Sequence, residues 1–203
     1  MPIKLLLLAI AGLLPGLAVA DHAAVPESLK GCVSCHGLDG RGADAGVPTM
    51  GGVSASYLNN QMEQFRAGAR PCVAEAFARA GQSGDHCSIA KDMSDAAVAE
   101  SSGFYAALDF LPAAQDFDAK KAAAGQRVHA TRCGFCHTGQ GRNPDDDAGI
   151  LAGQPMAYMS ATLKAYQAGK RWQPDMKAMV MKALDDAAID SLVHFYASAS
   201  APD

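Results

Sequence analysis

Two short stretches decide the fold of this chain: CVSCH at residues 32–36 and CGFCH at residues 133–137. In each stretch two cysteines lie about one helical turn apart, and a histidine follows the second cysteine directly. Thiols at this spacing can add to the two vinyl groups of haem, and the adjacent imidazole can then bind the iron. We therefore predict two covalently bound haem c groups, attached through Cys32, Cys35, Cys133 and Cys136, with His36 and His137 as iron ligands.

Two other chemistries use cysteine pairs of this kind. A thioredoxin-like redox pair has no need of a histidine after both copies of the motif. A single zinc ion held by the four cysteines would leave both histidines without a role. The haem interpretation is therefore the one that accounts for all the residues of both motifs.

The beginning of the chain has the pattern of a secretory signal. Lys4 is followed by an apolar run and then by Ala-Val-Ala at residues 18–20, so we expect cleavage before Asp21 and export to the periplasm. A membrane anchor is the alternative, but the run is short for a membrane span and Pro15 interrupts it. The formal net charge is −4, and cleavage would remove one lysine, which argues against nucleic acid as a partner and for protein partners.

The two motifs belong to two copies of one sequence unit. Cys32 and Cys133 are 101 positions apart, and the same shift aligns the residues that follow, as far as Arg70 over Arg171, without a gap. Further along, the shift falls to 91, which places Met93 over Leu184. We therefore predict two domains, residues 21–111 and 119–203, joined by a linker at 112–118.

The change of shift means that the first copy has ten additional residues between Arg70 and Met93. This insertion contains the two remaining cysteines, Cys72 and Cys87. In an oxidising compartment we expect them to form a disulfide, which would restrict the unfolded chain by roughly 3 kcal/mol. Free thiols, or thiols linked to a partner, are the alternative.

The apolar residues predict an all-α fold. Alanine-rich segments with apolar spacing near 3.6 indicate helices at residues 56–67, 95–108, 119–131, 156–168 and 186–197. Each copy should also have a helix that carries its CxxCH motif. Ser94 and Asp185 are expected to be the N-caps of the closing helices. Because each unit is small, a buried haem would supply apolar volume that its own core lacks.

The two-copy layout, the stretch GILAGQ at residues 149–154 and the closing FYAS at residues 195–198 resemble the dihaem cytochromes c of the cytochrome c4 family. Within this group the chain is most similar to the cytochrome subunit of flavocytochrome c sulfide dehydrogenase, through residues 112–118, 129–137 and 150–154. The resemblance implies two tandem class I cytochrome c domains that transfer electrons.

The likeness also implies partners. A flavoprotein (FAD) sulfide dehydrogenase would donate the electrons, and a downstream cytochrome or oxidase would accept them, so the chain would not be a catalyst on its own. A free shuttle of the c4 type that serves a terminal oxidase is the alternative function. A dihaem enzyme with its own substrate is a third.

In this family a distal methionine ligand precedes the first apolar residue of the closing helix by seven positions. Counting back from Met93 gives His86, which we expect to be the distal ligand of the first haem iron. Met50 and Met93 are the other candidates, but both are aligned with leucines in the second copy and are better explained as packing.

For the second haem, the same count back from Leu184 gives Lys177. A lysine would have to lose its proton to bind iron, so we expect Met176, which follows Pro174 closely, to be the ligand, with Met179 as the alternative. His129 and His194 are expected to be packing or surface residues.

These ligands predict a direction of electron flow. A thioether ligand raises the reduction potential of haem iron relative to a second imidazole. The haem with His36 and His86 should therefore have the lower potential, and electrons should move from the first haem to the second.

Overall fold

The computed structural model of the chain describes residues 25–74, 78, 81, 83–146 and 148–199. The predicted signal and its cleavage site lie outside these residues. Where the structure is described, its regular elements are all helices, as the sequence predicts. Among them no helix combines the length and the apolar character needed to span a bilayer.

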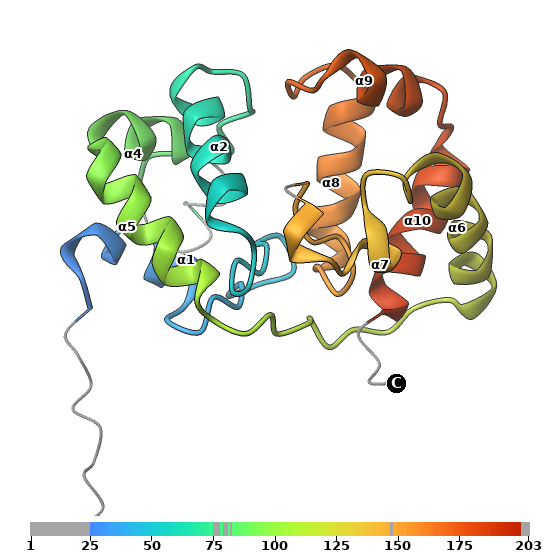
Figure 1. Cartoon of the computed structure of the whole chain (residues 1–203), viewed down its shortest axis with the longest axis horizontal. Coiled ribbons are helices and arrows are strands. Elements are labelled where there is room, and N and C mark those ends of the chain that lie inside the picture. Colours follow the sequence, from blue (N-terminus) through green and yellow to red (C-terminus); the bar gives the residue numbers. More distant parts are fainter. Residues whose placement is uncertain (1–24, 75–77, 79–80, 82, 147, 200–203) are drawn as a thin grey trace, which may run out of the picture.

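The helices form two groups that lie side by side (Figure 1). The first group contains η1 (Glu27–Leu29), α1 (Val33–His36), α2 (Ala55–Arg66), α4 (His86–Asp92) and α5 (Asp95–Ala106). The second contains α6 (Ala119–Arg132), α7 (Thr138–Gly141), η2 (Pro144–Asp146), α8 (Met156–Gln167), α9 (Asp175–Lys182) and α10 (Asp186–Ser198). A segment without regular structure, which includes the expected linker at 112–118, runs from one group to the other.

The second group is built on the crossing of α6 and α10. The two helices approach so closely at Gly125 that a Cβ atom there would lie 2.0 Å from the carbonyl oxygen of Ser191. Apolar residues of α8, α9, α10 and the turn between α9 and α10 complete the core: Met159, Leu163, Tyr166, Met181, Leu184, Ile189, Leu192, Val193, Phe195 and Tyr196. Within the described residues, the first group has only the short η1 in place of α6; η1 packs against α5 with Leu29 fully buried.

Five predicted helices are present as α2, α5, α6, α8 and α10, with both ends within two residues of the prediction. The N-caps were also predicted correctly. The Ser94 hydroxyl accepts a hydrogen bond from Ala97 N at 3.2 Å, and the Asp185 carboxylate accepts one from Ala188 N at 2.7 Å. The motif helices differ from expectation, because α1 is a single turn and α6 ends just before Cys133.

Two short helices, α4 and α9, hold the regions where distal iron ligands were expected. Helix α4 begins at His86 behind Asp85, whose side chain forms a reciprocal capping box with Ser88. Helix α9 begins directly after Pro174, which has an extended backbone and no N–H group that would need a partner at the helix start. The same order of elements, middle helix, short helix and closing helix, therefore occurs in both groups.

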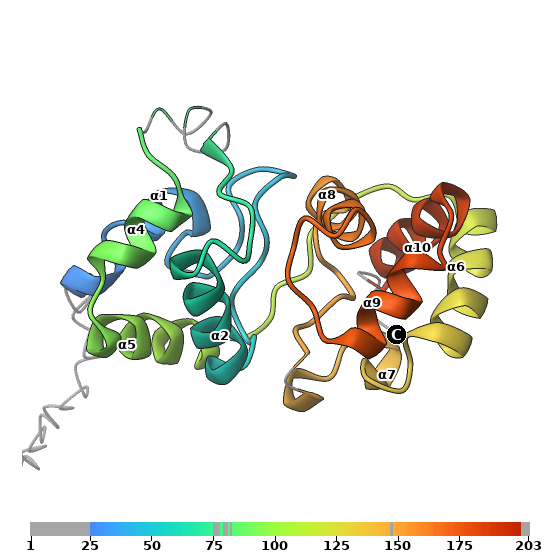
Figure 2. The same ribbon diagram turned by 90° about the horizontal axis from the view of Figure 1, so that it is seen from above.

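The two groups are joined by specific hydrogen bonds. The backbone N–H of Thr49 donates to Oε1 of Gln154, and Nε2 of Gln154 donates to the carbonyl of Thr49, both at 2.9 Å between buried groups. Backbone bonds from Tyr158 N to Ala45 O and from Trp172 N to Ala69 O add to the contact. Figure 2 shows the groups from above, with α2 and α8 on their inner sides.

Candidate haem sites

His36, in the first CxxCH motif, has the burial and the hydrogen bond that are typical of a metal ligand. His36 is 6 % exposed, and its Nδ1 lies 3.2 Å from the carbonyl oxygen of Pro48. A hydrogen bond to a carbonyl requires the proton to be on Nδ1, which leaves the lone pair on Nε2. Burial lowers the pKa of His36 to about 4, so the imidazole is neutral, as a ligand must be.

His86 faces this histidine from the first position of α4. The ring centroids of His36 and His86 are 6.3 Å apart. Two imidazoles that bind one metal atom from opposite sides, each through a bond of about 2 Å, have centroids separated by roughly this distance. The His86 ring also stacks on Phe65, at 4.7 Å between centroids and 11° between planes, so the ring has a defined orientation.

A disulfide fixes the insertion next to His86. Cys72 and Cys87 form a disulfide with 5.6 Å between their Cα atoms, as expected from the sequence. Cys87 is buried and packs with Phe65 and Ala90. The disulfide and this small cluster together hold the start of α4, and therefore His86, against α2.

None of the four motif cysteines takes part in a disulfide among the described residues. Cys32, Cys35 and Cys133 are partly buried and Cys136 is exposed, so all four are open to reaction with a haem. Burial raises the pKa of the thiols of Cys32 and Cys133.

The second motif holds His137, which is half-buried. Burial, followed by the nearby charge of Lys177, lowers the pKa of His137 to about 4. Gly149, which is aligned with Pro48, lies close enough for its carbonyl to raise that pKa in part. In the described part of the chain, the buried Nδ1 of His137 makes no hydrogen bond of normal geometry.

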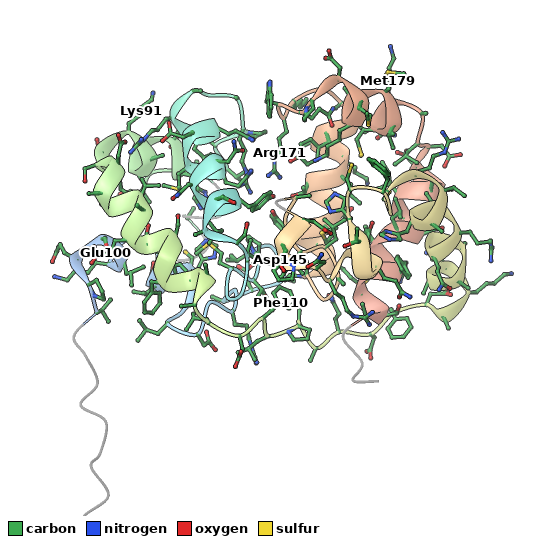
Figure 3. The ribbon with its side chains drawn as sticks, in the orientation of Figure 1. Lys91, Glu100, Phe110, Asp145, Arg171 and Met179 are labelled. Carbon is green, nitrogen blue, oxygen red and sulfur yellow. A yellow bond between two sulfur atoms is a disulfide. The ribbon has the colours of Figure 1, made fainter. Side chains whose placement is uncertain are left out.

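The two methionines expected as distal ligands of the second haem are largely exposed. Met176 and Met179 are 66 % and 73 % exposed, and Figure 3 shows Met179 pointing away from the body of the protein. Lys177 lies between them on α9, and its Nζ is 3.4 Å from the centroid of the Tyr166 ring. Burial and then the charge of Arg171 lower the pKa of Lys177 to about 7.

The two histidines expected to be packing or surface residues make hydrogen bonds in the second group. His129 is buried, with Nδ1 3.0 Å from the Tyr196 hydroxyl, and Nδ1 of His194 accepts a hydrogen bond from the backbone N–H of Asp118 at the start of α6. The Met93 carbonyl accepts a bond from Arg66 where α4 ends. Met50 is half-buried beside the buried Thr49.

Two arginines between the helix groups were not predicted as site residues. Arg70 donates to the Tyr158 hydroxyl at 3.4 Å, and Arg171, 3 % exposed, donates to Gln61. The Nε of Arg171 is buried and has no hydrogen-bond partner within the described residues. Haem carries carboxylates that would accept such a bond, so this donor fits the cofactor. The signal in the sequence was the alignment of Arg70 with Arg171.

Thiols, buried neutral imidazoles and an unsatisfied cationic donor together fit two haem c groups. Bound haem iron would supply one-electron chemistry, because it changes between the ferrous and ferric states. The protein residues would fix the haem edges and set the polarity around each iron.

Known proteins agree with this geometry. Residues 26–99 match the family described as cytochrome c. The chain is 32 % identical over 180 residues to a thiosulfate dehydrogenase electron acceptor of Thiomonas intermedia, covering 83 % of this chain and 77 % of that protein. It is 27 % identical to cytochrome c4 of Azotobacter vinelandii, covering 93 % and 94 % of the two chains.

A solved structure shows the same fold. The crystal structure of reduced cytochrome c4 from Pseudomonas stutzeri superposes with a TM-score of 0.67 at 21 % identity, covering 83 % of this chain and 93 % of the other. The predicted tandem arrangement of class I cytochrome c domains with two haem c groups is therefore confirmed. This chain belongs to the family of electron-transfer c-type cytochromes that includes cytochrome c4 and the thiosulfate dehydrogenase electron acceptors.

Proposed function

We propose that this protein accepts electrons in the periplasm from a dehydrogenase that oxidises an inorganic sulfur compound, with thiosulfate dehydrogenase as the donor. The relative from Thiomonas intermedia is named for this role, and that likeness extends over 83 % of the chain. The electrons would leave to a downstream cytochrome or oxidase.

The observation that carries the proposal is the fixed pairing of two haem sites. The Thr49 and Gln154 amides bond reciprocally across the contact between the helix groups, and Arg70 and Arg171 each reach the opposite group. A rigid contact of this kind keeps the distance between two redox centres constant. One site can then receive an electron while the other releases one.

Location in the periplasm is supported by two features. The first twenty residues have the charge and apolar pattern of an export signal. The disulfide between Cys72 and Cys87 is typical of an oxidising compartment.

A flavoprotein sulfide dehydrogenase is the second candidate donor. It is favoured by the resemblance at residues 112–118 and 150–154, which contact each other in the structure. Ala113 N donates to Gly153 O at 2.8 Å, and Gln115 bonds to both Gln154 and Met156. This contact orders the connecting segment but does not touch a substrate, so it supports the family relation more than the identity of the donor.

The test is a comparison of electron donors. Oxidised dihaem protein is mixed with catalytic amounts of thiosulfate dehydrogenase and thiosulfate, or with flavoprotein sulfide dehydrogenase and sulfide, and haem reduction is followed by absorbance. We expect fast reduction with the first pair. A faster reaction with the flavoprotein would replace the thiosulfate proposal with the second candidate, and no reduction by either would leave the free shuttle.

A control uses the protein with thiosulfate alone. Because the chain is proposed to carry electrons and not to oxidise the substrate, its haems should stay oxidised. Steady turnover without a dehydrogenase would instead indicate a dihaem enzyme.

A further inference from the structure

The distal residues of the two sites occupy one position of the repeat. The shift of 91 that aligns Met93 with Leu184 also aligns His86 with Lys177. His86 is in α4 and Lys177 is in α9, the short helices that come directly before the closing helices. Met176 and Met179 have no such correspondence with His86.

The contacts of the two residues match as well. The His86 ring stacks on Phe65, and the Nζ of Lys177 lies over the ring of Tyr166. Phe65 and Tyr166 are aligned by the shift of 101 and occupy the same place on the middle helices α2 and α8.

An arginine completes each arrangement. The guanidinium of Arg70 lies 4.4 Å from the centroid of Phe65, and that of Arg171 lies 4.5 Å from the centroid of Tyr166. The same group of three therefore occurs in both units with nearly the same geometry: an aromatic residue, an arginine, and His86 or Lys177.

In the first unit His86 lies opposite His36, with 6.3 Å between the two ring centroids. In the second unit Lys177 is half-buried, and its Nζ takes the place over Tyr166 that the His86 ring takes against Phe65. Met176 and Met179, on the same helix, are largely exposed.

We propose that Lys177, and not Met176, is the distal ligand of the second haem iron. To bind, the ammonium group would release one proton to solvent, which would leave the nitrogen lone pair free to donate to iron. This assignment goes beyond the proposed function, because it holds for either electron donor. It rests on the presence of two covalent haems and on the repeat-matched geometry of α9.

The first experiment is spectroscopy on the oxidised dihaem protein. A thioether bound to ferric haem gives an absorption feature at the red end of the visible spectrum, and an amine does not. We expect Lys177→Met to gain one such feature and to raise the potential of one haem only. The matched controls Met176→Leu and Met179→Leu should have the spectrum and both potentials of the wild type. Loss of a wild-type feature in either control would overturn the assignment.

The second experiment removes the ligand. In Lys177→Ala one iron should become open to cyanide, so that binding rises from none to one per molecule. The assignment would also be overturned if the Met176→Ala protein bound cyanide and the Lys177→Ala protein did not. If Lys177→Ala fails to mature, the spectra of the wild type, Lys177→Met and the two leucine controls still decide the question.

Discussion

The contact between the two haem units should depend on one glutamine. Gln154 is 4 % exposed, and its side chain bonds to both backbone groups of Thr49, which is 2 % exposed. In Gln154→Ala, an N–H and a carbonyl of Thr49 would be buried without partners. Each such group costs about 1–3 kcal/mol, so the closed contact would lose about 2–6 kcal/mol. The units can escape this cost by separating, which lets water reach Thr49.

We therefore expect Gln154→Ala to uncouple the two units during unfolding. Guanidinium unfolding, followed by haem absorbance, should show two transitions where the wild type shows one. Gln167→Ala is the matched control, because Gln167 donates its bond to Leu184 inside the second unit. It should lower stability by about 1 kcal/mol without separating the transitions. A single transition in Gln154→Ala, within about 0.5 kcal/mol of the wild type, would refute the reasoning.

Three other variants test the structure. Replacing Cys72 and Cys87 by serine opens a loop whose ends are 15 residues apart, and should lower the unfolding free energy of the first unit by about 3 kcal/mol in a denaturant titration. Gly125→Ala places a methyl group against the Ser191 carbonyl, and should lower thermal stability by about 1–3 kcal/mol or more through forced separation of α6 and α10. Arg171→Gln removes a buried cation, and should lower the potential of the second haem in a spectroelectrochemical titration, while Arg171→Lys should restore it in part.

The long helices could be predicted because their information is local. Five segments combine alanine-rich composition with apolar spacing near 3.6, and two of them begin at cap residues, Ser94 and Asp185, that the structure confirms. Helices α4 and α9 have only seven and eight residues, too few to give a clear period. These two helices start after Asp85 and Pro174, and aspartate and proline are also common in loops.

The haem motifs could be predicted for a similar reason, because two thiols and an imidazole at fixed spacing are all that attachment needs. The distal ligand of the second haem is harder to predict. Met176, Lys177 and Met179 lie within four residues, and a helix turns by about 100° per residue, so each of them faces a different direction. The sequence shows which donors are near the site, but only the placement of α9 against Tyr166 shows which one turns inward.

The assignment of Lys177 changes the basis for the direction of electron flow. With Met176 as ligand, a thioether would have raised the potential of the second haem, but an amine lacks that effect. The surroundings of the two irons must then set the offset. Arg171 is 3 % exposed beside the second site, whereas Arg70 is half-buried beside the first. A cation that is better shielded from water favours the reduced iron more strongly. Electrons should therefore still move from the first haem to the second, across a smaller difference that Arg171→Gln would reduce further.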